Sequence, residues 1–212
     1  MRTEFTPQTD DLCRLVNTAF RHAAVNLTEL TTSQVKLQAT RLSLQPVSEL
    51  SAASLACEDG ILATVHQFYD GALVGDALFL LNKDDAGNLA ELLTQEQNGD
   101  NTLDTSGREA ITEVGNIMFN ACLGVFSEVF RSHLAFSLPR LHLSTLEKTL
   151  RSLLLSQRDS RSSVAVLTQL EIQRVTFNGC LLLIMGDKSL QRVISATSRN
   201  QQEPQFATAS IM

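Results

Sequence analysis

The chain has 212 residues, 43% of them hydrophobic, and its 17 basic and 23 acidic residues give a formal net charge of −6. This composition predicts a packed core, and an acidic chain with no tryptophan and one tyrosine is a poor match for nucleic acid, whose binding needs basic and aromatic surfaces. No run approaches the ~18 apolar residues that span a bilayer, and the polar N-terminal segment lacks a secretory signal, so we expect a cytoplasmic protein without membrane insertion.

The first half of the chain predicts two helices with three strands between them. Apolar residues three or four apart indicate helices, and apolar–polar alternation indicates half-buried strands. The Asp70-Gly71 pair favours a hairpin turn. The predicted elements are a helix at 8–30, a strand at 35–44, a connector with room for a short helix at 46–55, strands at 61–69 and 73–81, and a helix at 84–93.

The second half repeats this order. The Asn178-Gly179 pair again favours a hairpin, and FYDGALVGDALFLL in the first half parallels TFNGCLLLIMG in the second. The predicted elements are a helix at 106–131, a strand at 137–143, a short helix at 146–154, strands at 164–175 and 177–185, and a helix at 189–197.

This repeat predicts an α+β fold with an internal duplication. Neither half has enough strands for a sheet of its own, so we expect a single domain over residues 1–212. In it, two similar halves, 1–100 and 101–200, are related by a pseudo-two-fold axis. They share a mainly antiparallel sheet of about six strands with long helices packed on it. A polar tail is expected at 200–212.

The predicted helix at 106–131 has two distinct faces. Gly115 stands among its buried positions, where a missing side chain permits close approach to the sheet. A polar stripe opposite an apolar one is typical of any surface helix, so the spacing alone does not define a site. The apolar stripe is Ile111, Val114, Met118, Cys122, Val125 and Val129, and the polar stripe is Glu109, Glu113, Asn116 and Asn120.

The polar stripe resembles the signature of the CheC/CheX/FliY family of CheY phosphatases, and the chain is most similar to a CheC-like protein. That signature is an acidic residue or serine, three residues, Glu, two residues, Asn, twenty-two residues and Pro. Glu113, Asn116 and Pro139 match it at the full spacing, whereas Glu109 stands where the family has Asp or Ser. The duplicated organisation also looks like that family's fold, so the resemblance covers nearly the whole chain.

The first predicted helix carries an altered copy of the same signature. Asp10 and Asn17 fit the pattern, but Arg14 stands in place of the glutamate and Thr40 in place of the proline. The resemblance therefore implies one working site and a degenerate first site, whose helix is kept for structure or contact.

The resemblance implies a phosphatase that hydrolyses the aspartyl phosphate of a phosphorylated CheY-like response regulator in chemotaxis signalling. Asn116 would orient the attacking water, Glu113 would pair with a lysine of the regulator, and Glu109 would support them. It implies no metal or cofactor held by this chain, because Mg²⁺ is bound by the regulator. Arg14 and Glu109 keep open a non-catalytic module that binds a response regulator or a flagellar-switch component, and a homodimer is also left open.

Other groups with chemical potential predict no second site. The four cysteines are scattered among apolar residues, which indicates core positions in a reducing compartment. The histidines have no metal-ligand spacing and are expected on the surface or in strands. A basic run of Lys148, Arg151, Arg158 and Arg161 is expected to be a solvated face. The histidines are His22, His66, His133 and His142.

Overall fold

The structure is a computed structural model that describes residues 7–58, 60–95, 103–131, 133–155 and 161–199, so the predicted tail at 200–212 lies outside the described residues. Every predicted helix is present, with ends within two residues of those expected. The helices are α1 (Pro7–Thr31), α2 (Lys83–Thr94), α3 (Thr105–Phe130), α4 (Leu146–Leu155) and α5 (Asp187–Arg199), with a 3-10 helix η1 (Val47–Glu49). The strands are β1 (Val35–Pro46), β2 (Ile61–Gly71), β3 (Gly75–Asn82), β4 (Leu134–Phe136), β5 (Arg140–Thr145), β6 (Arg161–Ile172) and β7 (Val175–Gly186).

All strands join one antiparallel sheet that both halves of the chain build together. Its order is β1-β6-β7-β3-β2-β4, and β5 also pairs with β2. The strand segments that follow the long helix of each half pair with the other half, since β1 lies on β6, and β4 and β5 lie on β2. The strands from β1 to β5 lie across the sheet in the order β1-β6-β7-β3-β2-β5. If β1, β2 and β3 are exchanged with β5, β6 and β7, the result is the same order in reverse. The predicted α+β class is confirmed, with seven strands where about six were expected.

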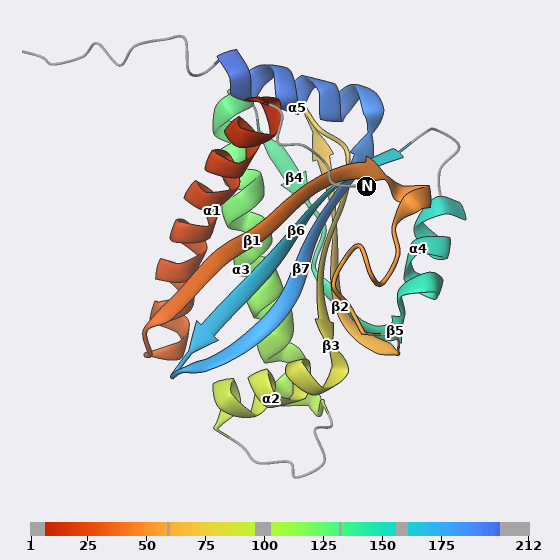
Figure 1. Cartoon of the computed structure of the whole chain (residues 1–212). Coiled ribbons are helices and arrows are strands. Elements are labelled where there is room, and N and C mark those ends of the chain that lie inside the picture. Colours follow the sequence, from red (N-terminus) through yellow and green to blue (C-terminus); the bar gives the residue numbers. More distant parts are fainter. Residues whose placement is uncertain (1–6, 59, 96–102, 132, 156–160, 200–212) are drawn as a thin grey trace, which may run out of the picture.

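Helices cover both faces of this sheet (Figure 1). The long helices α1 and α3 pack against each other on one face, while α4 and η1 lie on the other, and α5 and α2 sit at opposite ends. The central strands β3 and β7 are buried on both sides, which explains their continuous apolar segments ALFLL and CLLLIM. Two hydrophobic clusters result, one on each face of the sheet.

The helix α3 is the central helix of the larger cluster. Its first turn is capped by Asp104, whose side chain accepts a hydrogen bond from the Gly107 amide at 2.8 Å. By length and composition α3 could span a membrane, yet 56% of its most apolar window is buried within the fold. A Cβ atom on Gly115 would lie 2.7 Å from the Val65 side chain of β2. The predicted close approach of Gly115 to the sheet is therefore confirmed.

The second hairpin turns at a different place from the one predicted. The strands β6 and β7 meet at Gln173 and Arg174, whose φ values of 51° and 69° match a two-residue type I′ turn. Asn178 and Gly179 instead lie inside β7, so the predicted strand bounds at 164–175 and 177–185 were wrong there. Gly179 is needed for packing, because a Cβ atom on it would lie 2.9 Å from the Phe79 ring.

Smaller differences concern β1, β3 and the strand predicted at 137–143. The strand β1 runs on to Pro46, and β3 begins at Gly75 after a loop that follows Asp70-Gly71. Pro139 lies in a break between β4 and β5, because proline has no N–H to continue a ladder. At the equivalent point of β1, around Thr40, the chain keeps a single strand with a shift of register between Ala39 and Arg41.

Candidate functional site

The polar stripe of α3 faces outward, as predicted. Glu109, Glu113 and Asn120 are exposed and Asn116 is half-buried. The opposite side of α3 packs on the sheet, with all of its predicted apolar residues buried except Val129, which is half-buried. The fold therefore presents Glu113 and Asn116 on the surface while fixing the backbone that carries them.

Hydrogen bonds connect the stripe residues along the helix. Asn116 donates from Nδ2 to Glu113 Oε2 at 3.3 Å, and its Oδ1 accepts from Asn120 Nδ2 at 3.2 Å. A carboxamide has two N–H donors and an oxygen with two lone pairs. Asn116 thus keeps one donor and one lone pair for an external group, while its neighbours hold the plane of the amide.

A hollow of about 630 Å³ lies beside this stripe, between α3 and the sheet edge formed by β5. Glu109 and Glu113 both line it, and so does Leu141 of β5. Arg108 closes one side, where its Nη2 donates to the Leu141 carbonyl at 3.1 Å. Two carboxylates one helical turn apart repel each other, so the side of the hollow lined by Glu109 and Glu113 favours the approach of a cation, while Arg108 offsets part of their charge at the other side.

The matched proline lies in the segment that leads to this edge. That segment is fixed by Ser137, whose backbone N–H donates to the Phe68 carbonyl at 2.9 Å. Gln67 Nε2 also donates to the Ser137 carbonyl at 2.7 Å. Leu141, two residues after Pro139, is the residue that reaches the hollow beside Glu113. Sequence reasoning missed Arg108 and Leu141, because no local pattern shows that α3 meets β5 there.

The first helix presents a different surface. Asp10, Arg14 and Asn17 are exposed on α1, which confirms only that they face outward. The hydrogen bonds here connect other groups: Arg21 Nη2 donates to Thr18 Oγ1 at 2.9 Å, and Thr18 Oγ1 donates to the Arg14 carbonyl at 3.0 Å. An arginine stands where α3 has Asn120, so the arrangement of amide and carboxylate on α3 has no copy on α1.

The basic run was partly misjudged, because Arg161 is buried. Its side chain is 3% exposed, and its Nη2 donates to Asp76 Oδ2 at 2.7 Å. Asp76 Oδ1 also lies 2.8 Å from His66 Nε2. Burial alone would raise the pKa of Asp76, but the hydrogen bonds from His66 and Arg161 outweigh it and lower that pKa. Arg158 lies outside the described residues.

The cysteines are core residues rather than reactive groups. Cys122 and Cys180 are buried, and Cys13 and Cys57 are half-buried. Burial raises the pKa of the Cys122 thiol to about 12 and that of Cys57 to about 11, which leaves little thiolate at neutral pH. Within the described part of the chain, no group of three or more His, Cys, Asp or Glu residues is placed to hold a metal ion.

Solved structures with the same fold are known. FliY from Thermotoga maritima is similar over 94% of this chain and 100% of its own, with a TM-score of 0.74 and 15% sequence identity. A chain of the FliM-SpeE complex from H. pylori is similar over 95% of this chain and 100% of its own, with a TM-score of 0.67 and 11% identity. A chain of the FliG-FliM complex from H. pylori has a TM-score of 0.62 and 12% identity, over 90% of this chain and 99% of its own.

These structures define the class of fold. The chain has a CheC/CheX/FliY-like fold, which confirms the fold implied by the signature around Glu113 and Asn116. At such low identity the similarity concerns the fold and not the activity. No protein-family model matches the sequence, and no curated protein matches it.

Proposed function

We propose that the chain is a cytoplasmic phosphatase that hydrolyses the aspartyl phosphate of a CheY-like response regulator. The observation that carries this proposal is the exposed pair of Glu113 and Asn116 on α3, in a matching fold and at the spacing of the family signature. The phosphoryl group, its Mg²⁺ and the conserved lysine all belong to the regulator. This chain needs to supply only a docking surface and a group that positions water.

Glu113 is the docking group in this proposal. It faces a hollow that it shares with Glu109, and two carboxylates there attract the ammonium group of a lysine. Glu113 can accept from the lysine through Oε1 while its Oε2 keeps the hydrogen bond from Asn116 Nδ2, because a carboxylate has two acceptor oxygens. The second N–H of Asn116 Nδ2 then remains available for a phosphate oxygen.

Asn116 positions the water. Its Oδ1 accepts one hydrogen bond from Asn120 and has a second lone pair, which can accept from a water molecule in line with the phosphorus. Phosphoryl transfer has a loose transition state, so positioning supplies most of the rate enhancement. The water attacks phosphorus, the bond to the aspartyl oxygen breaks, and phosphate leaves with the regulator's carboxylate restored.

A second candidate is a module that binds a regulator or a flagellar-switch component without hydrolysis. It is favoured by the similarity to chains of the FliM-SpeE and FliG-FliM complexes, whose names describe binding partners. Glu109, which departs from the family signature, and Arg14 on α1 also favour it. Both candidates use the outer face of α3, and they differ in whether phosphate is released.

Release of phosphate from a phosphorylated CheY-like regulator tests the proposal. Asn116→Ala should slow release by on the order of 10²-fold, because the water loses its positioning group. Binding of the regulator should change little, since the docking glutamate remains. Asn17→Ala is the matched control, because it truncates the same side chain on α1, where Arg14 replaces that glutamate.

The control should leave the rate nearly unchanged, and a double variant should behave like Asn116→Ala alone. Equal losses from Asn17→Ala and Asn116→Ala, with helicity preserved by circular dichroism, would show that the one-site interpretation is wrong. A wild-type chain that binds the regulator but releases no phosphate would favour the binding module.

A further inference from the structure

A second hollow, of about 560 Å³, lies on the other face of β2, between β2, β5 and α4. Side chains alternate along a strand, so Val65 faces α3 whereas Thr64 and His66 face this hollow. Among the described residues that line it there is no aspartate or glutamate. Its polar lining includes Thr64, His66, Arg108, His142, Ser144 and Lys148.

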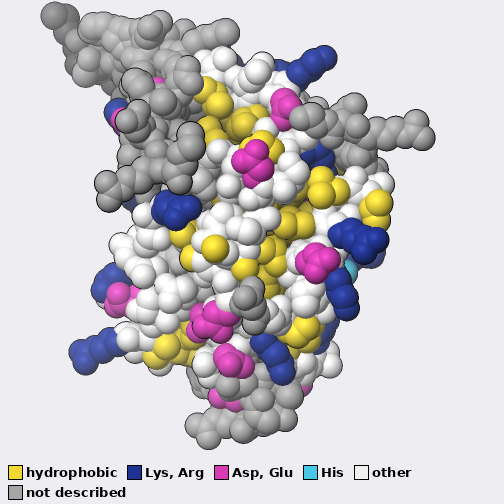
Figure 2. All heavy atoms as spheres, turned by 45° about the vertical axis from the view of Figure 1, so that its right-hand side comes forward, with side chains coloured by type: hydrophobic (Ala, Val, Ile, Leu, Met, Phe, Trp, Pro, Cys, Tyr) yellow, Lys and Arg dark blue, Asp and Glu magenta, His cyan; other side chains and the backbone are white. Residues whose placement is uncertain are grey.

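The lining is positively charged, although the chain as a whole is acidic. The lining holds the guanidinium of Arg108 and the ammonium group of Lys148, and no described carboxylate forms an ion pair with Lys148. Burial lowers the pKa of His142, and the nearby charges of His66, Arg140 and Arg108 lower it further. Figure 2 shows this side of the molecule, with Lys and Arg side chains gathered next to a histidine at the right-hand edge.

One hydrogen-bond donor in the hollow lacks a partner. Thr64 is 1% exposed, and its hydroxyl is buried without a hydrogen bond among the described residues. Buried hydroxyls nearly always have a partner, so this one calls for an acceptor that the chain itself does not provide. The neighbouring hydroxyls are satisfied, since Ser144 and Thr149 lie 2.7 Å apart and Ser152 donates to the Thr149 carbonyl at 2.8 Å.

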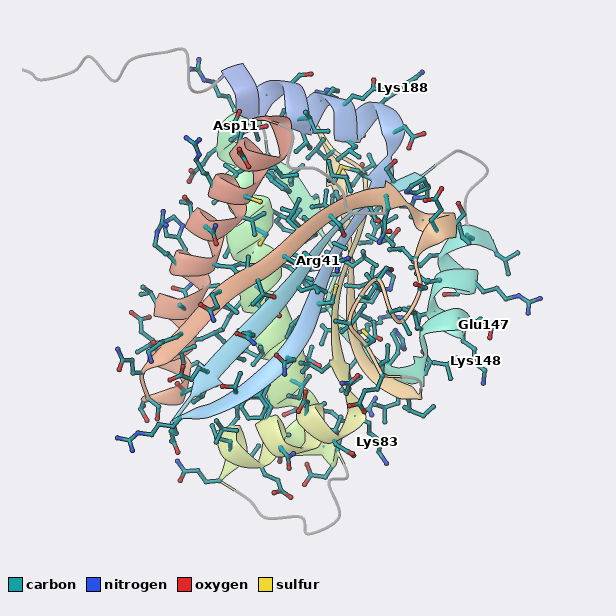
Figure 3. The ribbon with its side chains drawn as sticks, in the orientation of Figure 1. Asp11, Arg41, Lys83, Glu147, Lys148 and Lys188 are labelled. Carbon is teal, nitrogen blue, oxygen red and sulfur yellow. The ribbon has the colours of Figure 1, made fainter. Side chains whose placement is uncertain are left out.

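We propose that this hollow binds a small anion that carries a phosphate group. A phosphate oxygen accepts hydrogen bonds from guanidinium, ammonium and hydroxyl groups, which are the donors that Arg108, Lys148 and Thr64 bring together. The volume is in the range of small-molecule sites. Lys148 lies at the end of α4 that follows β5, with its exposed side chain at the rim of the hollow (Figure 3).

This site does not depend on the proposed phosphatase activity. Thr64 and His66 place it on the other face of β2 from the Glu113 hollow, and the two hollows meet at the β5 edge, where Arg108 and Leu141 line both. Its test therefore uses the chain alone, without a regulator. If phosphate does not bind, the result of the phosphate-release assay is unaffected. If the chain releases no phosphate from a regulator, the result of the binding test is likewise unaffected.

Titrations followed by amide NMR shifts test the site, with inorganic phosphate, phenyl phosphate and acetate as probes at constant ionic strength. Both phosphates should bind saturably and shift the amides of Thr64, His142 and Lys148, and acetate should not. Lys148→Gln should weaken phosphate binding roughly tenfold, because a charge-assisted contact is lost. Arg151→Gln is the matched control on the same helix, since it makes the same change of charge and faces a different hollow.

Thr64→Val gives a second, independent variant, because valine keeps the shape and removes the hydroxyl. It should weaken phosphate binding roughly tenfold while the thermal midpoint stays equal or rises, since the hydroxyl has no partner to lose. Equal losses from Lys148→Gln and Arg151→Gln would overturn the proposal and indicate attraction by surface charge in general. Binding of acetate as tight as that of phosphate, or no saturable binding of either phosphate, would overturn it as well.

Discussion

Asn116 is held in place by the two residues that it contacts on α3. An exposed asparagine normally samples several rotamers, and fixing such a side chain costs conformational entropy. Because its hydrogen bonds to Glu113 and Asn120 already restrict the side chain in the folded helix, part of that entropy is lost on folding and not on binding. The amide is thus oriented before any partner arrives, which is the condition that makes a single side chain effective in positioning water.

The charge of Glu113 can be tested apart from its size. In the proposed docking mode, Glu113→Ala would remove the partner of the regulator's lysine, whereas Glu113→Lys would also place a cation against it. We expect the lysine variant to bind a phosphorylated regulator at least about tenfold more weakly than the alanine variant, since like charges in an interface repel strongly. The measurement is the dissociation constant from a titration, with circular dichroism to confirm the fold. Equal affinities would show that no cation meets Glu113.

At the scale of elements, the contact between α3 and β2 sets the position of the site. Gly115 lies between Glu113 and Asn116 in the sequence and faces Val65 on the other side of the helix. A Cβ atom there would come within 2.7 to 3.0 Å of three atoms of Val65, which is too close without movement. Any side chain on Gly115 must therefore displace either Val65 of β2 or α3, which carries Glu113 and Asn116.

Gly115→Ala should destabilise the protein by about 1–3 kcal/mol, because the cost of overpacking exceeds the gain of about 1 kcal/mol in helix propensity. Gly124→Ala is the matched control in the same helix, where a Cβ atom would meet nothing within 4 Å. That variant should be neutral or stabilised by up to about 1 kcal/mol. Chemical denaturation of both measures the difference, and equal stabilities would contradict the packing argument.

The sequence predicted the elements better than their contacts. The apolar periodicity of α1 and α3 is local, so both helices were predicted to within two residues. The hairpin near Asn178-Gly179 was misplaced, because Gly179 makes room for Phe79 of β3 rather than forming a turn. The signature located Glu113 and Asn116, but not the hollow beside them. That hollow depends on how α3 meets β5, which only the tertiary fold decides.

Across the whole molecule, the two halves are alike in the core, where they share one sheet, and differ at their surfaces. The long helices bury equivalent apolar faces, and their outer faces carry Glu113 on α3 and Arg14 on α1. The strand next to each helix also differs, since β1 is continuous and its counterpart is divided around Pro139. A duplicated core thus tolerates different polar groups on its two long helices, because the outer faces that carry Glu113 and Arg14 are exposed.

A buried ionic cluster ties this sheet together across both halves. Asp76 of β3 contacts His66 of β2 and Arg161 of β6, and the Asp76 and Arg161 side chains are 9% and 3% exposed. The Nε and Nη1 groups of Arg161 have no hydrogen-bond partner among the described residues. Asp76 is therefore the group that compensates the buried charge of Arg161. Removal of one member of such a buried pair leaves the other charge uncompensated.

The dependence of stability on pH follows from the lowered pKa of Asp76. A carboxyl group whose pKa is lower in the folded than in the unfolded state stabilises the fold above the unfolded value of about 3.9, and this contribution is lost as the pH falls through the folded value. Asp76→Asn should therefore reduce the free energy of unfolding by on the order of 3 kcal/mol at pH 7, and by less below about pH 4. Urea denaturation from pH 3 to 7 measures this.

The control for Asp76→Asn is Glu171→Gln, which removes one member of an exposed ion pair across β1 and β6. Lys36 Nζ lies 2.9 Å from Glu171 Oε1, and the two side chains are 63% and 37% exposed. Solvent screens such a pair, so its loss should change the free energy of unfolding by less than about 1 kcal/mol at any pH. A loss for Asp76→Asn that stays constant from pH 7 to pH 3 would mean that the ionised form of Asp76 does not stabilise the sheet. The packing of the buried Asp76 side chain, and not its charge, would then account for its role between the two halves.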